Sequence, residues 1–263
     1  MQNHKTDYVR TDENAVVKIA LLSVIGDREE QQDCAGVQLN NNEGLVVVCD
    51  GMGGHKGGQL AGELAVRTML SRYAEDFPCN DPRTWLLEAA ADIDLAVSCL
   101  HDRSGEKLNA GSTMVAAYIA DRSLYWLSVG DSRLYIFRDG ELVRATADHN
   151  YQSVLNRQLQ NGLIDKDAYD RQIGQGEALV SFLGVNGLPY IESNDLPFGL
   201  KSGDRLLLAT DGLYRLISDE GICSIINNFT DISEMVHALE MKARRCAGHV
   251  ARDNMTVAAI TVK

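Results

Sequence analysis

Proline and long apolar runs are scarce in this sequence. Only four of its 263 residues are proline and there is no low-complexity tract, which excludes a proline-rich stalk or linker. No stretch approaches the roughly 18 uninterrupted apolar residues of a membrane helix, and the opening MQNHKTDYVR lacks the apolar core of a signal peptide. Six cysteines occur without C-x-x-C spacing, which favours free thiols in a reducing compartment. We therefore expect a cytoplasmic protein without membrane association.

Basic charge is also in short supply. Lys and Arg number 25 against 37 Asp and Glu, a net formal charge of −12, and no local basic patch stands out. Such a chain repels nucleic-acid phosphates, so nucleic acid is not an expected partner, and a phosphate group would be handled through bound cations. An apolar content of 45% is that of an ordinary globular protein. The length favours one domain, residues 1–263, over two small ones.

The pattern of expected elements indicates an α+β fold. Runs rich in β-branched residues predict strands at 15–25, 44–49, 112–119, 124–129, 134–137, 141–144, 205–209 and 255–262. Apolar residues at intervals of three and four predict helices at 59–77, 83–101 and 233–246. The short connections, such as the turn at Asp139-Gly140, make neighbouring strands antiparallel. Runs of strands followed by paired helices are typical of α+β proteins.

Residues 150–203 form the least regular segment of the sequence. The segment carries two prolines, seven glycines and one helical stretch near 151–161. Long segments of this kind are often functional or mobile.

Five aspartates lie beside the expected strands. They are Asp33 in the loop after the first strand, Asp50 after VVVC, Asp131 after LYWLSVG, Asp211 after RLLLAT, and Asp253 shortly before the last strand. Carboxylates that converge repel one another unless cations lie among them, and oxygen ligands select Mg²⁺, Mn²⁺ or Ca²⁺. The alternative is that each aspartate only caps a turn, as Asp139 does in its hairpin.

The glycine-rich stretch GMGGHKGG at 51–58 is not a nucleotide-binding loop. Lys56 is followed by glycine rather than Ser or Thr, and the spacing G-x-G-x-x-G is absent. The glycines instead allow the backbone to approach closely beside Asp50, where the Gly51 carbonyl is a potential metal ligand.

The order of these motifs resembles that of the type-2C, metal-dependent Ser/Thr protein phosphatases. The matching segments are Gly26-Asp27-Arg28 with Gln31-Gln32-Asp33, VVVCDGMGGHKGG, Gly111-Ser112-Thr113, LSVGDSRLYIFRDGEL, Ala147-Asp148-His149, LLLATDGLY and Ala251-Arg252-Asp253-Asn254. They run from about residue 26 to the C-terminus, and the DGMGG form resembles the bacterial branch. The resemblance implies two antiparallel sheets packed as a central sandwich flanked by pairs of helices (α-β-β-α). It also implies a flap-like insertion around 150–203.

The resemblance also implies a set of metal ligands. Asp50 would bridge two Mg²⁺ or Mn²⁺ ions, and the Gly51 carbonyl would bind the second ion. Asp211 and Asp253 would complete the shell of the first ion. Asp131 would join Asp211 in holding a third, weaker ion. Asp33 would reach the second ion through water.

On the same basis, Arg28 receives the substrate phosphate and a hydroxide bridging the two ions attacks phosphorus directly. His55 is weighed evenly between a substrate contact and a solvated loop residue. The implied partners are phosphorylated proteins and a cognate Ser/Thr kinase, and a monomer is expected. Two rivals remain: a catalytically silent relative that acts as a signalling or docking module, and an enzyme acting on small phosphate esters. A silent relative would be expected to lack Asp50, Asp211 or Asp253, and this chain has all three.

Overall fold

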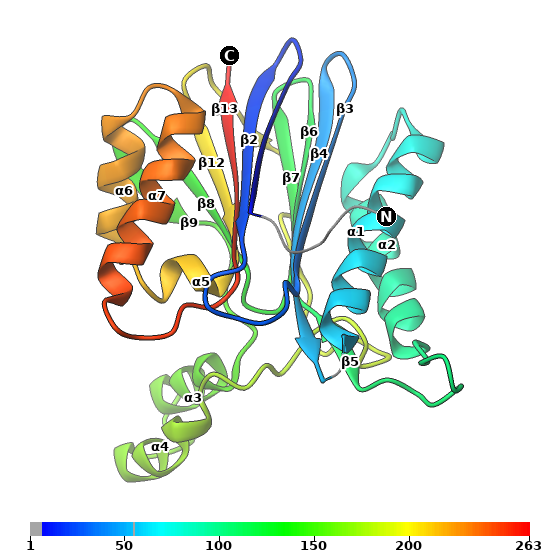
Figure 1. Cartoon of the computed structure of the whole chain (residues 1–263), viewed down its shortest axis with the longest axis vertical. Helices are drawn as coiled ribbons and strands as arrows, with labels where there is room; N and C mark the ends of the chain where they lie inside the picture. Colours follow the sequence, from blue (N-terminus) through cyan, green and yellow to red (C-terminus); the bar gives the residue numbers. More distant parts are fainter. Residues whose placement is uncertain (1–6, 55) are drawn as a thin grey trace.

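The strands of the chain form two antiparallel sheets that pack face to face (Figure 1). The computed structural model describes residues 7–54 and 56–263. The first sheet has the order β1 (Tyr8–Glu13), β2 (Val17–Val24), β13 (Met255–Val262), β12 (Arg205–Ala209), β8 (Arg133–Arg138), β9 (Glu141–Arg144). The second has the order β10 (Glu192–Ser193), β7 (Ser123–Val129), β6 (Met114–Ala120), β4 (Glu43–Gly53), β3 (Asp33–Leu39), with β11 (Phe198–Gly199) paired to β7 and β5 (Ala110–Ser112) paired to β4.

Both faces of each sheet are covered, and successive residues along a strand contribute side chains to opposite faces. In β4, Leu45 and Val47 point to the helices that cover the second sheet, whereas Val46 points into the space between the sheets. In β2, Ile19 faces the other sheet and Ala20 faces the helices on the outer side of the first sheet. Because successive side chains of a strand point to opposite faces, a continuous apolar run is required wherever both faces are covered.

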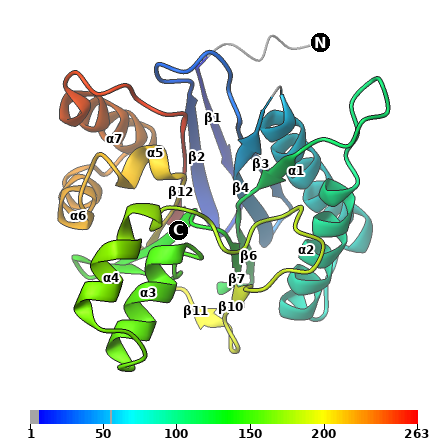
Figure 2. The same ribbon diagram turned by 90° about the horizontal axis from the view of Figure 1, so that it is seen from below.

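Paired helices cover each outer face (Figures 1 and 2). Helices α1 (Gly57–Asp76) and α2 (Pro82–Ser98) pack on the second sheet. Helices α5 (Asp211–Tyr214), α6 (Asp219–Asn228) and α7 (Ile232–Ala247) pack on the first. Helix α2 begins where the Asp81 side chain accepts a hydrogen bond from the Thr84 amide, and Asp231 caps α7 in the same way. The expected α-β-β-α fold is confirmed.

The segment 150–203 contains two further helices and two short strands. Helices α3 (Tyr151–Gln160) and α4 (Lys166–Gln172), followed by the 3₁₀ turn η1 (Ile173–Gln175), project from the end of the sandwich where α5 lies (Figures 1 and 2). The later part of the segment runs along β7, where β10 and β11 pair. The segment is therefore partly a projection and partly an edge of the second sheet.

Two expectations about individual aspartates were wrong. Asp33 is the first residue of β3 rather than a loop residue, because DCAGVQL pairs with β4 although alanine and glycine weaken its strand pattern. Asp50 lies within β4, which continues to Gly53 because β5 extends the ladder past the apolar run.

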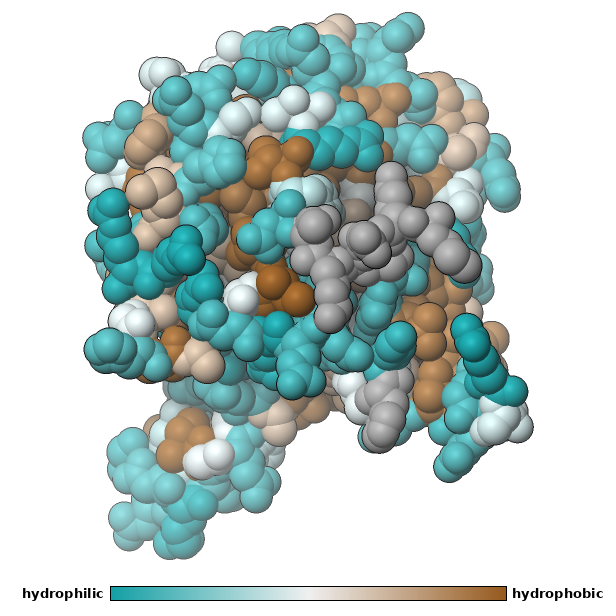
Figure 3. All heavy atoms as spheres, viewed as in Figure 1, coloured by the Kyte–Doolittle hydropathy of each residue, from teal (hydrophilic) through white to brown (hydrophobic). Residues whose placement is uncertain are grey.

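The visible surface is mostly polar. Figure 3 shows hydrophilic residues over most of the visible face. Within residues 7–54 and 56–263, no helix has both the length and the apolar character needed to cross a bilayer.

Candidate metal and phosphate site

The five predicted aspartates come from elements that meet at one end of the sandwich. Asp33 and Asp50 are direct partners in the β3–β4 ladder. Asp211 is the first residue of α5, two residues after the end of β12, and Asp253 lies two residues before β13, the neighbour of β12. Asp131 lies two residues before β8, which pairs with the other edge of β12. This is the lower end in Figure 1 and faces the viewer in Figure 2.

The carboxyl groups are buried close enough to disturb one another. Burial raises the pKa of Asp50 well above its usual range, and Asp33, Asp211, Asp131 and Asp253 raise it further, in that order. Burial also raises the pKa of Asp33 to about 7 and that of Asp131 to about 6, and Asp211 adds to both shifts. Ionised together, these groups carry more negative charge than the neighbouring Arg28 and Arg215 offset.

Two glycines allow the strands and helices of this end to approach so closely. A Cβ atom at Gly51 would lie 2.0 Å from the Gly58 carbonyl oxygen, where the start of α1 crosses β4. A Cβ atom at Gly212 would lie 2.0 Å from the Asn254 carbonyl oxygen, where α5 crosses the approach to β13. Both contacts are possible only without a side chain, and they bring Asp50, Asp211 and Asp253 together.

The donor set fits hard divalent cations. Among the described residues, no Lys or Arg pairs with Asp33 or Asp50, whereas Asp211 pairs with Arg215 at 2.8 Å and Asp253 pairs with Arg28 at 2.5 Å. Across the same residues, no three Asp, Glu, His or Cys side chains are arranged so that they could hold a metal ion. Oxygen donors without Cys or His suit Mg²⁺ or Mn²⁺ rather than Zn²⁺. The cluster thus holds the negative charge that such ions would neutralise.

Arg28 lies at the mouth of this acidic end. Its side chain is 60% exposed, and one terminal nitrogen contacts the Asp253 carboxylate. Beside this pair, Arg252 donates to both carboxylate oxygens of Asp27 at 2.9 and 3.2 Å. The two crossed ion pairs attach the β2–β3 loop to the segment before β13. A guanidinium in this place presents further donors to solvent, in a fork that suits a phosphate group.

Asn254 and Thr210 organise the site and were not predicted. The Asn254 side chain donates to the carbonyls of Ile25 and Glu30, and it accepts a hydrogen bond from the Gln32 amide. The Thr210 hydroxyl donates to the Asp33 carboxylate at 2.8 Å. The available signal was the position of Thr210 directly before Asp211 and of Asn254 directly after Asp253, but neither residue is acidic.

His55 lies outside the described residues, so its proposed substrate contact has no structural account. Met52, which stands between Gly51 and Gly53, pairs with Gly111 in the β4–β5 ladder. Gln32 donates through its side chain to the Gly53 carbonyl at 3.3 Å, so it supports the same turn.

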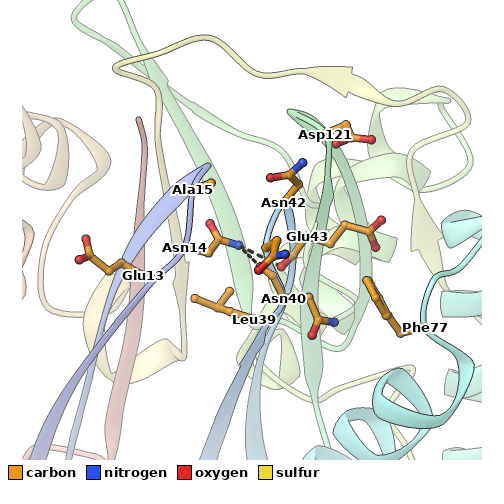
Figure 4. A pocket seen from close by; sticks show the side chains of 10 residues that line it. Glu13, Asn14, Ala15, Leu39, Asn40, Asn42, Glu43, Phe77 and Asp121 are labelled. Carbon is orange, nitrogen blue, oxygen red and sulfur yellow. Dashed lines mark hydrogen bonds between the residues drawn. The ribbon is translucent and has the colours of Figure 1, made fainter.

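A hollow of about 730 Å³ lies far from these residues (Figure 4). Its lining residues are Glu13, Asn14, Ala15, Leu39, Asn40, Asn41, Asn42, Glu43, Phe77 and Asp121. Glu43 starts β4, seven residues before Asp50, which corresponds to roughly 23 Å along the strand. The hollow therefore sits at the opposite end of the sandwich and contains none of the predicted site residues.

Known proteins resemble this chain over most of its length. The serine/threonine phosphatase stp of Listeria monocytogenes is 32% identical over 236 residues, covering 88% of this chain and 89% of that protein. Among solved structures, the serine/threonine phosphatase of S. agalactiae has a TM-score of 0.80 and 26% identity, covering 94% of this chain and 100% of that one.

A second structure has a bearing on metal binding. The catalytic domain of the serine/threonine protein phosphatase PstP, in complex with two manganese ions, has a TM-score of 0.74 and 28% identity, covering 94% of this chain and 98% of that one. The sequence pattern described as protein phosphatase 2C matches residues 23–245. With this match spanning most of the sequence, the chain belongs to the protein phosphatase 2C family.

Proposed function

We propose that the chain removes phosphate from phosphoserine and phosphothreonine in proteins, with two Mg²⁺ or Mn²⁺ ions held at the acidic end of the sandwich. Family membership makes the chain a metal-dependent phosphoprotein phosphatase, and the enzyme class expected from the motifs is thereby confirmed. The observation that carries the proposal is the set of four buried aspartates, Asp33, Asp50, Asp131 and Asp211, whose pKa values are raised by burial and by the neighbouring carboxylates, with Asp253 beside them at the surface.

Four of the aspartates are proposed as metal ligands at places that suit them. Asp50 lies at the centre, because the other four carboxylates all raise its pKa, and this position supports a bridging ligand. Asp211 and Asp253 approach from the first sheet, and Asp33 approaches from the second. The Gly51 carbonyl is proposed as the backbone ligand beside Asp50.

Arg28 is proposed to bind the substrate phosphate. Its exposed guanidinium leaves donors free on the solvent side, and the ion pair with Asp253 holds it over the carboxylate cluster. A dianionic phosphate is attracted by this cation and by the bound ions. Without the ions, the negatively charged aspartates repel it. Phosphate binding at Arg28 therefore depends on the metal ions being present.

Among the residues that the structure describes, the thiols beside these aspartates are poor nucleophiles, because burial raises the pKa of both Cys34 and Cys49. Cys49, directly before Asp50, is fully buried and points toward α1 and α2 rather than toward the carboxylates. When bound, the metal ions supply Lewis acidity that turns a water molecule into a nucleophile at neutral pH. The role of the aspartates is to fix these ions, and that of Arg28 is to orient the phosphate and offset its growing charge.

The proposal extends to the setting of the enzyme. We propose that residues 1–263 act as one catalytic domain, that the segment 150–203 forms a flap beside the site, and that the protein is a cytoplasmic monomer. A cognate Ser/Thr kinase is the proposed partner that supplies the phosphorylated substrates.

The substrate class is tested by comparing a phosphothreonine peptide with a sugar phosphate as substrates in the presence of Mn²⁺. The proposal predicts a much higher kcat/KM for the peptide, because a peptide can contact the α3–α4 projection as well as the site. Equal or better turnover of the sugar phosphate would favour a small-ester phosphatase. Tight binding of the phosphopeptide without turnover would favour the silent docking module.

A further inference from the structure

Arg215 lies between two of the buried aspartates. It directly follows α5, one helical turn after Asp211, and its Nε atom is 2.8 Å from the Asp211 carboxylate. One of its terminal nitrogens is 3.9 Å from the Asp131 carboxylate. The side chains of Asp211 and Asp131 are only 12% and 8% exposed, so the guanidinium is the cation that both carboxylates face.

This is the place where the resemblance put a third, weaker ion. The positive charge of the Arg215 guanidinium, 2.8 Å from one carboxylate and 3.9 Å from the other, repels a divalent cation that would approach the same oxygens. The pair of Asp131 and Asp211 therefore does not fit a third metal ion while Arg215 stays in position.

The neighbours of Arg215 hold this arrangement in place. The Tyr214 hydroxyl donates to the Asp131 carbonyl at 2.8 Å, which ties α5 to the loop before β8. The Arg133 guanidinium stacks on the Tyr214 ring, 3.5 Å from its centroid, and donates to both carboxylate oxygens of Asp148 at 2.9 and 2.8 Å. The position of Arg215 is thus set by a network that extends well beyond Asp211.

The far side of Arg215 contacts the projecting segment. A terminal nitrogen is 2.8 Å from the carboxylate of Glu177. The neighbours of Glu177 are bound to the start of α3, because the Gln152 amide donates to the Gly176 carbonyl and the Tyr151 amide donates to the Ala178 carbonyl, both at 2.8 Å. One side chain therefore connects the aspartate pair to the base of α3.

We propose that Arg215 replaces a third metal ion in this chain: its guanidinium is a built-in cation for Asp131 and Asp211, and it attaches the base of α3 to the site through Glu177. This inference rests on the proposed function, since it presumes that two ions bind at the neighbouring aspartates. Arg215 is a positioning residue in this account, because it acts through Asp211 and through the flap.

The test is to count the Mn²⁺ ions bound by the full chain without substrate, by calorimetric titration and by the electron paramagnetic resonance of free Mn²⁺. We expect two ions in the wild type and a third, weaker ion in Arg215→Ala. Affinity at that third position should rise by about tenfold or more once the positive charge is removed. Arg215→Gln, which keeps much of the side-chain length without the charge, repeats the test if the alanine variant fails to fold.

Two matched variants locate the effect. Arg215→Lys keeps the charge and should still bind two ions, and Asp131→Asn introduced into Arg215→Ala should remove the gained ion. Three ions in the wild type, or an unchanged count in both Arg215→Ala and Arg215→Gln, would overturn the proposal. No bound Mn²⁺ in a folded wild type would contradict the proposed function instead.

The attachment to α3 has its own readout, which does not involve metal. Glu177→Gln should leave the Mn²⁺ count at two while trypsin cleaves the α3–α4 segment several-fold faster, at Lys166 or Arg171, because local opening becomes easier. An unchanged cleavage rate would show that the Arg215–Glu177 contact does not hold the segment.

Discussion

Asp33 and Asp50 face each other as direct partners in the β3–β4 ladder. Opposite residues of an antiparallel pair point to the same face of the sheet, so the two carboxyl groups share one side. The Thr210 hydroxyl donates a hydrogen bond to Asp33. Among the described residues, neither Asp33 nor Asp50 forms an ion pair with a Lys or Arg. The metal-free protein therefore carries a local charge repulsion that bound cations would relieve.

Replacing the central carboxylate tests this relationship. Asp50→Asn should lower kcat by at least about 100-fold, because the ions contribute several kcal/mol of transition-state stabilisation. The same variant should be more stable than the wild type in the absence of metal, since a buried charge among like charges is removed. Thermal unfolding with and without Mn²⁺ should show that the metal-induced rise in Tm is lost.

The matched control is another aspartate followed by glycine. Asp139 lies in the β8–β9 hairpin with a φ of 54°, a conformation that asparagine adopts readily. Asp139→Asn should leave activity and the Mn²⁺ response unchanged and alter stability by no more than about 0.5 kcal/mol. A wild-type Mn²⁺ response in Asp50→Asn, or a large loss of activity in the control, would mean that the site is misplaced.

The stability of the metal-free protein should fall as the pH rises. Burial raises the pKa of Asp33 to about 7, helped by Asp211 and Asp253 and opposed by the hydrogen bond from Thr210. In the unfolded chain the same group titrates near its usual value of about 4. Between these values the folded state holds the extra proton, so the stabilisation is complete below about pH 4 and is lost as the pH rises through about 7.

Urea unfolding of the metal-free protein at about pH 5.5 and about pH 8 measures this effect. The free energy of unfolding should be lower at the higher pH, and Asp33→Asn should reduce the difference. Saturating Mn²⁺ should also remove it, because metal binding favours the ionised carboxylates. A difference of the same size in the wild type and in Asp33→Asn would contradict the assignment to this carboxyl group.

Arg28→Ala should weaken phosphate binding. A charge-assisted hydrogen bond contributes about 1.5–3 kcal/mol, so KM for a phosphopeptide should rise by about 10- to 100-fold, with a smaller loss in kcat. Arg28→Lys should give an intermediate KM, because the charge remains while the planar fork is lost. Initial rates over a range of peptide concentrations measure both constants. An unchanged kcat/KM in the alanine variant would remove Arg28 from the substrate site.

One ion pair far from the site should matter for stability alone. Arg138 donates twice to Asp204, at 2.8 and 2.5 Å, and Asp204 is only 2% exposed. Arg138→Ala leaves this carboxylate buried without its partner and should lower the free energy of unfolding by about 3 kcal/mol. The exposed pair of Lys166 and Asp170 is the control.

Lys166→Ala should cost far less stability than Arg138→Ala, because solvent screens that exposed pair. Chemical denaturation at saturating Mn²⁺ compares the two variants. Equal losses would show that burial of Asp204 does not decide the strength of the first pair.

The elements that the sequence predicted well are those with strong local patterns. The strand at β12 runs over Arg205–Ala209 and that at β13 over Met255–Val262, as expected from their largely apolar sequences. Strand β1 was missed because its residues are almost all exposed, so no apolar pattern marks it. Strands β10 and β11 have two residues each and exist only because β7 offers an edge.

The carboxylates of the site were predictable because aspartates at strand ends and the family motifs both mark them. Their supporting residues were not. Thr210 reaches Asp33 across 177 positions of sequence, and Arg215 acquires its role only when Asp131 and Glu177 fold against it. Such roles depend on neighbours that are distant in sequence, and neither residue type indicates them by itself.

The most direct test of the account is the hydrolysis of a phosphothreonine peptide by the purified chain, first with Mn²⁺ or Mg²⁺ and then with excess EDTA. The account predicts turnover that appears with the metal, disappears with the chelator and returns when metal is restored in excess. Turnover that persists at full rate in EDTA, or no turnover with either metal in a protein shown to be folded, would contradict it.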